Sequence, residues 1–221
     1  MKVDIGGKVR SANDEIASRL RERFARAGVF VFNLISAPGS GKTALLEATA
    51  RLIGDGVELA AIVGDIATQA DADRLRAAGL RAHQIETRGS CHLDARMVET
   101  ALESLPPEGL DLLAIENVGN LVCPASYDLG ESLRFVLLSA PEGDDKPKKY
   151  PEAFLTSQVL VLTKADLFRY LPFDAARARR EALDINPRLE IFTVSALTGE
   201  GMDALAAFLV GEREKLRTSH A

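Results

Sequence analysis

The chain has 221 residues, of which 47% are hydrophobic and 27% are charged, a composition typical of an ordinary globular protein. Its net charge of -5 and its 5% aromatic content argue against the basic, base-stacking surface of a nucleic-acid-binding protein. No apolar run approaches the roughly 18 residues that a membrane span needs, and the two cysteines are too few for a disulfide framework. We therefore expect a single domain in a reducing cytoplasm, with no nucleic-acid or membrane partner.

The predicted elements alternate between helices and short buried strands. Apolar residues recur every four positions from Ser11 to Ala27, which predicts an amphipathic helix, and Val29 to Ile35 is a nearly continuous apolar run typical of a strand covered on both faces. This order predicts an α/β fold with a doubly wound, mostly parallel sheet flanked by helices, in which residues 1–28 pack as a helical segment on the body of residues 29–221. Further strands are expected over Glu58–Val63, Ala82–Ile85, Asp111–Ile115, Arg134–Ser139, Gln158–Thr163 and Glu190–Val194, and further helices from Thr43 and from near Ala70, Leu93, Phe173 and Met202.

A glycine-rich segment links the first buried strand to its helix. Gly39 and Gly41 free the backbone to point successive N–H groups at phosphate oxygens, and the helix N-terminus adds its partial positive charge. Lys42 would reach the β- and γ-phosphates, while the Thr43 hydroxyl would hold Mg²⁺. Ser36 stands where the usual P-loop pattern begins with Gly. The segment predicts a P-loop NTPase whose nucleotide contacts are Pro38, Gly39, Ser40, Gly41, Lys42, Thr43 and Ala44.

A second motif indicates which base is bound. The strand expected over Gln158–Thr163 is followed by Lys164 and Asp166. A carboxylate can accept hydrogen bonds from N1–H and the 2-amino group of guanine, which adenine lacks, and the Lys164 stem can lie along the base. The pattern resembles the guanine-specificity motif of GTPases, with Thr163 where Asn is commoner. Ser195, Ala196 and Leu197 after the last strand match the loop that supports the base in such proteins.

Two acidic residues are placed beside the phosphates. Asp65 follows one expected strand and Glu116 ends another, where carboxylates can hold Mg²⁺ and its waters. Helix capping is a serious rival explanation for Asp65. Gly119 would let the segment after Glu116 move as a switch. We assign Lys42, Asp65 and Glu116 as catalytic candidates, and expect slow intrinsic hydrolysis because no glutamine stands where small signalling GTPases position the attacking water.

Two short segments carry soft metal ligands. Cys91 and His92 adjoin each other before a helix, and Cys123 follows the Glu116 segment. Thiolates with an imidazole suit Ni²⁺, Zn²⁺ or Cu⁺ better than Mg²⁺. Taken singly, each residue is more often structural, and three ligands are one short of a closed zinc site. A two-fold dimer would bring two incomplete sets together.

In combination, these motifs resemble the hydrogenase-maturation nickel-insertion GTPases over almost the whole chain. The resemblance implies a P-loop GTPase domain that pairs face to face, with Cys91, His92 and Cys123 binding Ni²⁺ or Zn²⁺ at the dimer interface. It further implies that GTP hydrolysis loosens the dimer and releases nickel to a [NiFe]-hydrogenase precursor, with the help of a partner nickel metallochaperone. The polar stretch 142–151 is expected to be an exposed loop, whose lysines Lys146, Lys148 and Lys149 are candidates to reach the neighbouring subunit's nucleotide.

Three alternatives remain open on sequence grounds. The urease-accessory GTPases share the fold and the nickel task, but their metal motif resembles Cys-Pro-His, whereas Cys123-Pro124 is followed here by Ala125. A regulatory or scaffold GTPase would simply bury the cysteines. An ATP-dependent kinase would keep the phosphate loop, although Asp166 argues against it.

Overall fold

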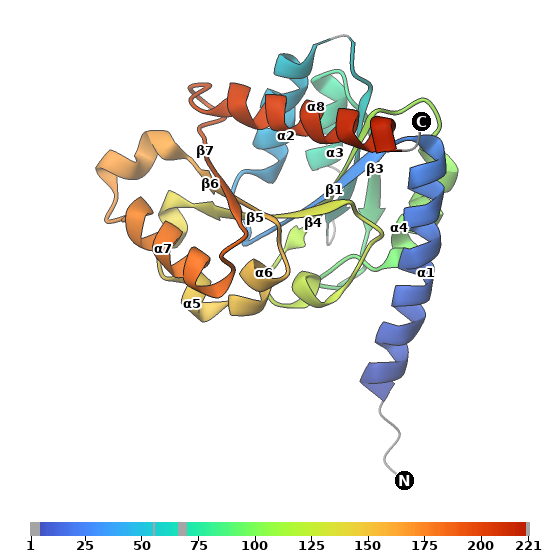
Figure 1. The fold of residues 1–221 in the computed structure, drawn as a ribbon, viewed down its shortest axis with the longest axis horizontal. Helices are drawn as coiled ribbons and strands as arrows, with labels where there is room; N and C mark the ends of the chain where they lie inside the picture. The colour runs from blue at the N-terminus through green and yellow to red at the C-terminus, as the bar shows by residue number, and fades with distance from the viewer. Residues whose placement is uncertain (1–4, 55, 66–69, 220–221) are drawn as a thin grey trace.

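A parallel sheet of seven strands, in the order β3-β2-β4-β1-β5-β6-β7, forms the centre of the computed structural model (Figure 1), which describes residues 5–54, 56–65 and 70–219. The inner strands are buried along nearly their whole length, as expected when helices cover both faces of a sheet. The strands are β1 Phe30–Ser36, β2 Leu59–Asp65, β3 Arg81–Glu86, β4 Leu112–Gly119, β5 Leu133–Ser139, β6 Val159–Thr163 and β7 Glu190–Thr193.

Helices cover both faces of this sheet (Figure 1). One apolar core lies under α2 Lys42–Ile53, α3 Ala70–Ala77 and α8 Met202–Ser219. Two further clusters on the opposite face lie under α1 Ile5–Ala27 with α4 Ala95–Ser104, and under α6 Pro151–Leu155 with α7 Ala175–Ile185. The remaining short elements are η1 Cys123–Ser126, η2 Ala140–Glu142, α5 Lys146–Lys149 and η3 Ala165–Tyr170.

The doubly wound α/β prediction is confirmed, and the differences are mostly at element ends. Helix α1 buries the predicted apolar residues Ile16, Leu20 and Phe24, but it begins at Ile5 rather than near Ser11. Helix α4 starts two residues later than predicted because the Asp94 side chain caps it, accepting a hydrogen bond from the N–H of Met97 at 2.8 Å.

Two predictions were wrong. The stretch 142–151 is not simply an exposed loop, because it contains α5 and the start of α6, and Pro147 is buried. Its beginning is fixed by a capping box in which Ser139 and Glu142 bond each other reciprocally. Strand β4 also continues to Gly119, so Glu116 lies inside the strand rather than at its end.

The sheet order places a topological switch point beside β1. The chain moves from β1 to β2 and β3 on one side of the sheet, and β5 to β7 extend it on the other, so the loops at the carboxyl ends of β1, β4 and β5 meet at one edge. In open sheets of this kind, ligands bind at that edge. Among the described residues, no helix is both long and apolar enough to span a membrane.

Candidate nucleotide and metal site

The phosphate loop connects β1 to α2, and its backbone has the left-handed turns that the sequence predicts. Gly39 and Gly41 have φ of 72° and 93°, values that favour glycine. Lys42 is buried, and its ammonium Nζ donates to the hydroxyl oxygen Oγ of Ser36 at 3.0 Å. Ser36, which departs from the usual pattern, therefore supplies a hydroxyl that holds the lysine in the loop.

Glu116 of β4 faces the start of α2. Its Oε1 accepts a hydrogen bond from the hydroxyl of Thr43 at 2.9 Å. On the next strand, Val63 is the register partner of Glu116, and β2 ends two residues later at Asp65. Strand pairing thus brings Thr43, Glu116 and the end of β2 into one region, as the sequence predicts for a Mg²⁺ site.

Burial shifts the pKa values of the two charged side chains in this region, Glu116 and Lys42. Burial raises the pKa of Glu116 to about 7, although the Lys42 ammonium acts in the opposite direction. Burial also lowers the pKa of Lys42, against the charges of Glu116 and Asp71. Within the described chain, the second oxygen of Glu116 is buried and has no hydrogen-bond partner. An unpartnered buried carboxylate oxygen beside a threonine hydroxyl fits a hard, oxygen-binding cation such as Mg²⁺.

The end of β4 lies directly against the phosphate loop. The register between β1 and β4 shifts after Leu34, so that Ser36 pairs with Gly119. A Cβ atom at Gly119 would lie 2.8 Å from the Cα of Pro38, closer than real Cβ contacts come. Only glycine fits this close approach. The phosphate loop and the end of β4 are therefore in direct contact, and a movement of one would displace the other.

A cavity of about 340 Å³ lies next to the loop, between Gly41 and Ala44 on one side and Lys164 and Asp166 on the other. The predicted base-binding residues Ser195, Ala196 and Leu197 line it as well. Asp166 Oδ1 accepts a hydrogen bond from the Ser195 hydroxyl at 2.5 Å, which fixes the carboxylate at the cavity wall.

The lysine and threonine of the base motif form hydrogen bonds to the backbone of the phosphate loop. The Lys164 ammonium donates to the carbonyl oxygen of Gly39 at 2.7 Å, so its stem crosses the loop. The Thr163 hydroxyl donates to the carbonyl oxygen of Ser40 at 2.7 Å. Thr163, which stands where GTPases commonly have Asn, thereby joins the base cavity to the phosphate loop.

Sequence reasoning missed Glu142. Its Oε1 accepts from the hydroxyl of Ser40 at 2.7 Å and from the hydroxyl of Ser139 at 2.6 Å, which attaches the segment after β5 to the phosphate loop. The signal was present in the sequence, because Ser139 and Glu142 have the spacing of a capping box.

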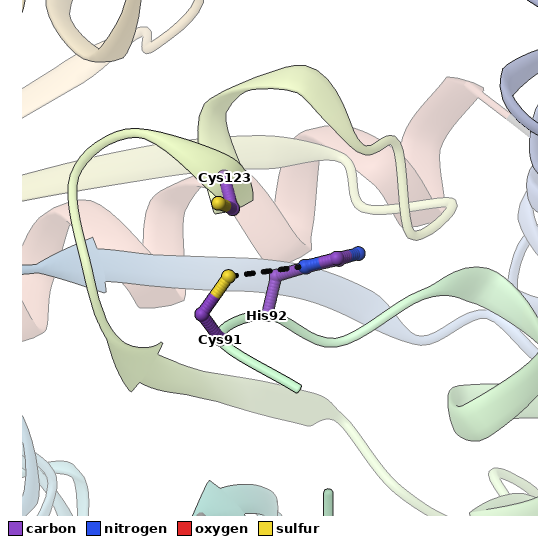
Figure 2. Close-up of side chains that lie close together, drawn as sticks. All are labelled: Cys91, His92 and Cys123. Carbon is purple, nitrogen blue, oxygen red and sulfur yellow. Dashed lines mark hydrogen bonds between the residues drawn. The ribbon is translucent and has the colours of Figure 1, made fainter. Parts of the chain in front are cut away.

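The three predicted soft ligands come together, although Cys123 is distant in sequence from the other two. One potential ligand atom from each of Cys91, His92 and Cys123 lies within 4.8 Å of the others. Figure 2 shows Cys91 and His92 on one segment and Cys123 on another, with the Cys91 sulfur 3.7 Å from His92 Nδ1. All three side chains are half-buried, so a metal ion can enter from solvent. The arrangement fits a soft divalent cation with an open coordination position.

Residues of β4 and β2 and the ring of Tyr127 contact the segment that carries His92. The side-chain carbonyl of Asn117 on β4 accepts a hydrogen bond from the N–H of Leu93 at 3.0 Å. The Leu93 side chain fills the space at Gly64 of β2, where a Cβ would come within 2.7 Å of it. The imidazole of His92 stacks on Tyr127, with ring centroids 4.0 Å apart. These contacts orient the imidazole before any metal arrives.

The pKa values of His92 and Cys123 are both shifted, and both shifts bear on cation binding. Burial lowers the pKa of His92, while Asp94 acts against this. The hydrogen bond with Cys91 and burial raise the pKa of Cys123, and repulsion between two thiolates so close adds to this shift. A bound divalent cation would remove that repulsion and favour both thiolates.

The lysines after β5 have partners within the chain. Lys148 pairs with Glu181 at 2.9 Å, and Lys149 pairs with Asp145 at 2.6 Å.

Residues 30–193 match the family model "CobW/HypB/UreG, nucleotide-binding domain". The hydrogenase maturation factor HypB of Rhizobium leguminosarum bv. viciae is 49% identical over 207 residues, which cover 94% of this chain and 69% of that protein. The hydrogenase/urease maturation factor HypB of Helicobacter hepaticus is 42% identical over 222 residues, which cover 99% of this chain and 91% of that protein.

A solved structure shows the same likeness in three dimensions. The crystal structure of HypB from Helicobacter pylori in complex with nickel matches with a TM-score of 0.88 and 39% identity, covering 92% of this chain and 96% of that one. The agreement extends over nearly the whole fold.

Proposed function

The chain belongs to the CobW/HypB/UreG family of nucleotide-binding domains and, within it, to the HypB hydrogenase maturation factors; on this premise we propose that it is a GTP-hydrolysing metallochaperone. In this proposal two copies pair on binding GTP and metal, hold nickel or zinc at their interface, and deliver nickel to a [NiFe]-hydrogenase precursor. A partner nickel metallochaperone takes part in the transfer.

One observation carries the proposal: neighbouring residues of β4 belong to both sites. Glu116 accepts from Thr43 in the phosphate region, and the next residue, Asn117, holds the backbone of Leu93 beside His92. Strand β4 therefore connects the phosphate region directly to the segment that carries the metal ligands. This is the physical basis on which nucleotide state can control metal binding.

Guanine selectivity is supported by the cavity next to the phosphate loop. Asp166 is held there by Ser195, and a carboxylate lining this cavity can accept the hydrogen bonds that guanine offers and adenine does not. If so, Asp166→Asn weakens GTP binding and leaves weak ATP binding unchanged. Equal affinity of the wild type for ATP and GTP would instead favour the kinase alternative.

For hydrolysis, Lys42 and the phosphate-loop backbone hold the phosphates, while Thr43, Asp65 and Glu116 would hold Mg²⁺. When bound, the cation supplies neutralisation of phosphate charge. No glutamine stands in the segment from Glu116 to Asn120. We expect slow turnover in the single chain and faster turnover in the dimer, where the second copy can add groups to the site.

The metal in this proposal is cargo. Cys91, His92 and Cys123 supply a soft but incomplete ligand set. A two-fold axis through this face would offer a second identical set, so that four or more ligands surround the ion only when two copies meet. Separation of the copies would then expose and release the ion.

The test is to measure molar mass and metal content together. Size-exclusion light scattering with elemental analysis is carried out with Ni²⁺ or Zn²⁺, in a GTP analogue and in GDP. We expect a dimer that carries metal with the GTP analogue, and a monomer with less metal in GDP. Cys91→Ser and Cys123→Ser should lose the metal, while Ser126→Ala, in the same short helix as Cys123 but bonded to Glu152, should keep it.

The outcomes separate the parts of the proposal. Metal content that is equal in both nucleotides would overturn the coupling and leave a metal-binding GTPase. A wild type without metal in either state would overturn the delivery function and favour the scaffold alternative.

Urease maturation is a second candidate, because the Helicobacter hepaticus relative is named for both hydrogenase and urease. The same nickel chemistry would serve either acceptor. Transfer of nickel from the purified chain to each apoenzyme precursor, measured in parallel, distinguishes the two.

A further inference from the structure

Asn120 lies between the phosphate loop and both metal-bearing segments. It is the first residue after β4, and its backbone forms an isolated antiparallel bridge with Ser36, where the phosphate loop begins. Three residues further on is Cys123. Ser36 in turn accepts the hydrogen bond of the Lys42 ammonium, the group that would meet the phosphates.

The side chain of Asn120 joins the two segments that carry the cysteines. Its amide nitrogen Nδ2 donates to the carbonyl oxygen of Cys91 at 3.3 Å. Its oxygen Oδ1 accepts from the N–H of Val122 at 2.9 Å, directly before Cys123. A single planar amide therefore determines how far apart the backbones of the two cysteines lie. Asp would keep only the acceptor, and Ala would keep neither bond.

Asn117, which also holds the histidine segment, has a different position. Asn117 is almost fully buried within β4 and bonds Asn33 on the neighbouring strand, so the sheet fixes it. Asn120 lies beyond the sheet, is half-buried, and is attached to the phosphate loop by a single bridge. Of the two asparagines, Asn120 is therefore the one that a change in the phosphate loop can displace without disturbing the sheet.

We propose that Asn120 is the positioning residue that adjusts the separation of Cys91 and Cys123 to the state of the phosphate loop. This inference rests on the proposed function and specifies how nucleotide reaches the metal. When phosphates engage Lys42, Ser36 loses or changes that hydrogen bond, the bridge to Asn120 shifts, and the amide carries the shift to both cysteine segments. Without the amide, the metal still binds but no longer responds to the nucleotide.

The test uses Ni²⁺ as a spectroscopic probe on the full chain. Thiolate-to-nickel charge-transfer absorption and the nickel Kd are measured in GDP and in a GTP analogue with Mg²⁺. For the wild type, both the band and the Kd should differ between the two nucleotides. In Asn120→Ala we expect the nucleotide-dependent ratio of Kd values to fall to within about 2-fold of unity, and the band to become the same in both states. Nucleotide affinity should stay within about 3-fold of the wild type, since the hydrogen bonds of this side chain go to Cys91 and Val122.

Asn186→Ala is the matched control. The Asn186 amide also bonds backbone, donating to the carbonyl oxygens of Phe154 at 3.2 Å and Ser157 at 2.8 Å, but at the end of α7. Its loss should lower the melting temperature without changing the nucleotide dependence of nickel binding. Asn120→Asp, which keeps the acceptor for Val122, should give an intermediate ratio and carries the test if the alanine variant does not fold.

Three outcomes would overturn the inference. One is an Asn120→Ala variant whose nickel Kd keeps the full nucleotide dependence of the wild type. Another is a uniform loss of nickel affinity with that dependence intact, which would make Asn120 merely structural. A wild type whose nickel binding ignores the nucleotide would overturn the proposed coupling as well, and so identifies the failure of the proposed function.

Discussion

The nucleotide region and the metal centre lie at the same edge of the sheet but are built to different degrees of completeness. The nucleotide region is cross-connected within one chain: Lys164 bonds Gly39, Thr163 bonds Ser40, and Glu142 bonds Ser40 from a third segment. The metal centre has three half-buried ligands on two segments. The difference is one of ligand number: contacts from three segments of the chain hold the phosphate loop, whereas the three soft ligands are one short of the four that a closed zinc site uses.

The largest expected effect is a loss of GTP affinity. Lys42→Met removes the buried ammonium that would bond the β- and γ-phosphates. Two charge-assisted hydrogen bonds of roughly 1.5–3 kcal/mol each correspond to a loss of about 1000-fold in GTP affinity. Calorimetric titration with GTP measures it. Nickel binding without nucleotide should be unchanged; its loss would show that the two regions are one structural unit.

The next largest effect is a loss of nickel affinity. Cys123→Ser replaces a thiolate ligand by a hydroxyl of similar size, and nickel affinity should fall by at least about 100-fold, beyond what outer partners of a metal site contribute. Competition with a chromophoric chelator gives the Kd. The affinity for GDP should stay at the wild-type value. A GDP affinity that falls in parallel would mean that the substitution disturbs β4 rather than the ligand set.

A third prediction uses the pKa of Glu116, which burial raises to about 7 from its ordinary value of 4.5. A raised pKa means that the folded, ligand-free chain binds a proton that the unfolded chain has released. This contribution to stability is therefore present at low pH and is lost as pH rises from about 4.5 through 7.

Glu116→Gln removes this titration. Its unfolding free energy should fall less between pH 5 and 8 than that of the wild type, by an amount on the order of 2 kcal/mol. Urea denaturation at a series of pH values, without Mg²⁺ or nucleotide, measures the difference. Parallel pH profiles for the two proteins would show that Glu116 is ionised throughout. With Mg²⁺ and GTP, the variant should lose the stabilisation that the wild type gains.

The smallest expected effect is a modest loss of GTP affinity through a change in the base cavity. Ser195→Ala removes the hydroxyl that holds Asp166 but leaves the carboxylate in place. We expect GTP affinity to fall by less than 10-fold, in line with about 1 kcal/mol for one hydrogen bond. The GTP to ATP affinity ratio is the readout, with Thr198→Ala as a neighbouring control. An unchanged ratio would mean that Asp166 is oriented by other contacts.

Local patterns in the sequence were enough to predict much of this molecule. The phosphate loop, the buried strands and the base motif could be predicted because strand periodicity, glycine turns and loop chemistry depend on residues adjacent in sequence. The sequence also contained the capping box of Ser139 and Glu142, although its link to Ser40 was not expected. The stretch 142–151 was predicted wrongly because short helical turns with many lysines look polar locally, while packing buries Pro147.

By itself, the sequence determined which residues were available: a phosphate loop, a candidate guanine-binding carboxylate and three candidate soft ligands. Only the tertiary structure decided that Cys91, His92 and Cys123 meet within 4.8 Å, because β2, β3 and β4 are neighbours in the sheet. It also decided that Asn117 and Asn120 hold the metal segments while β4 contacts the phosphate loop. Such contacts join residues far apart in the chain, and their geometry depends on the packing of the whole sheet rather than on any local pattern.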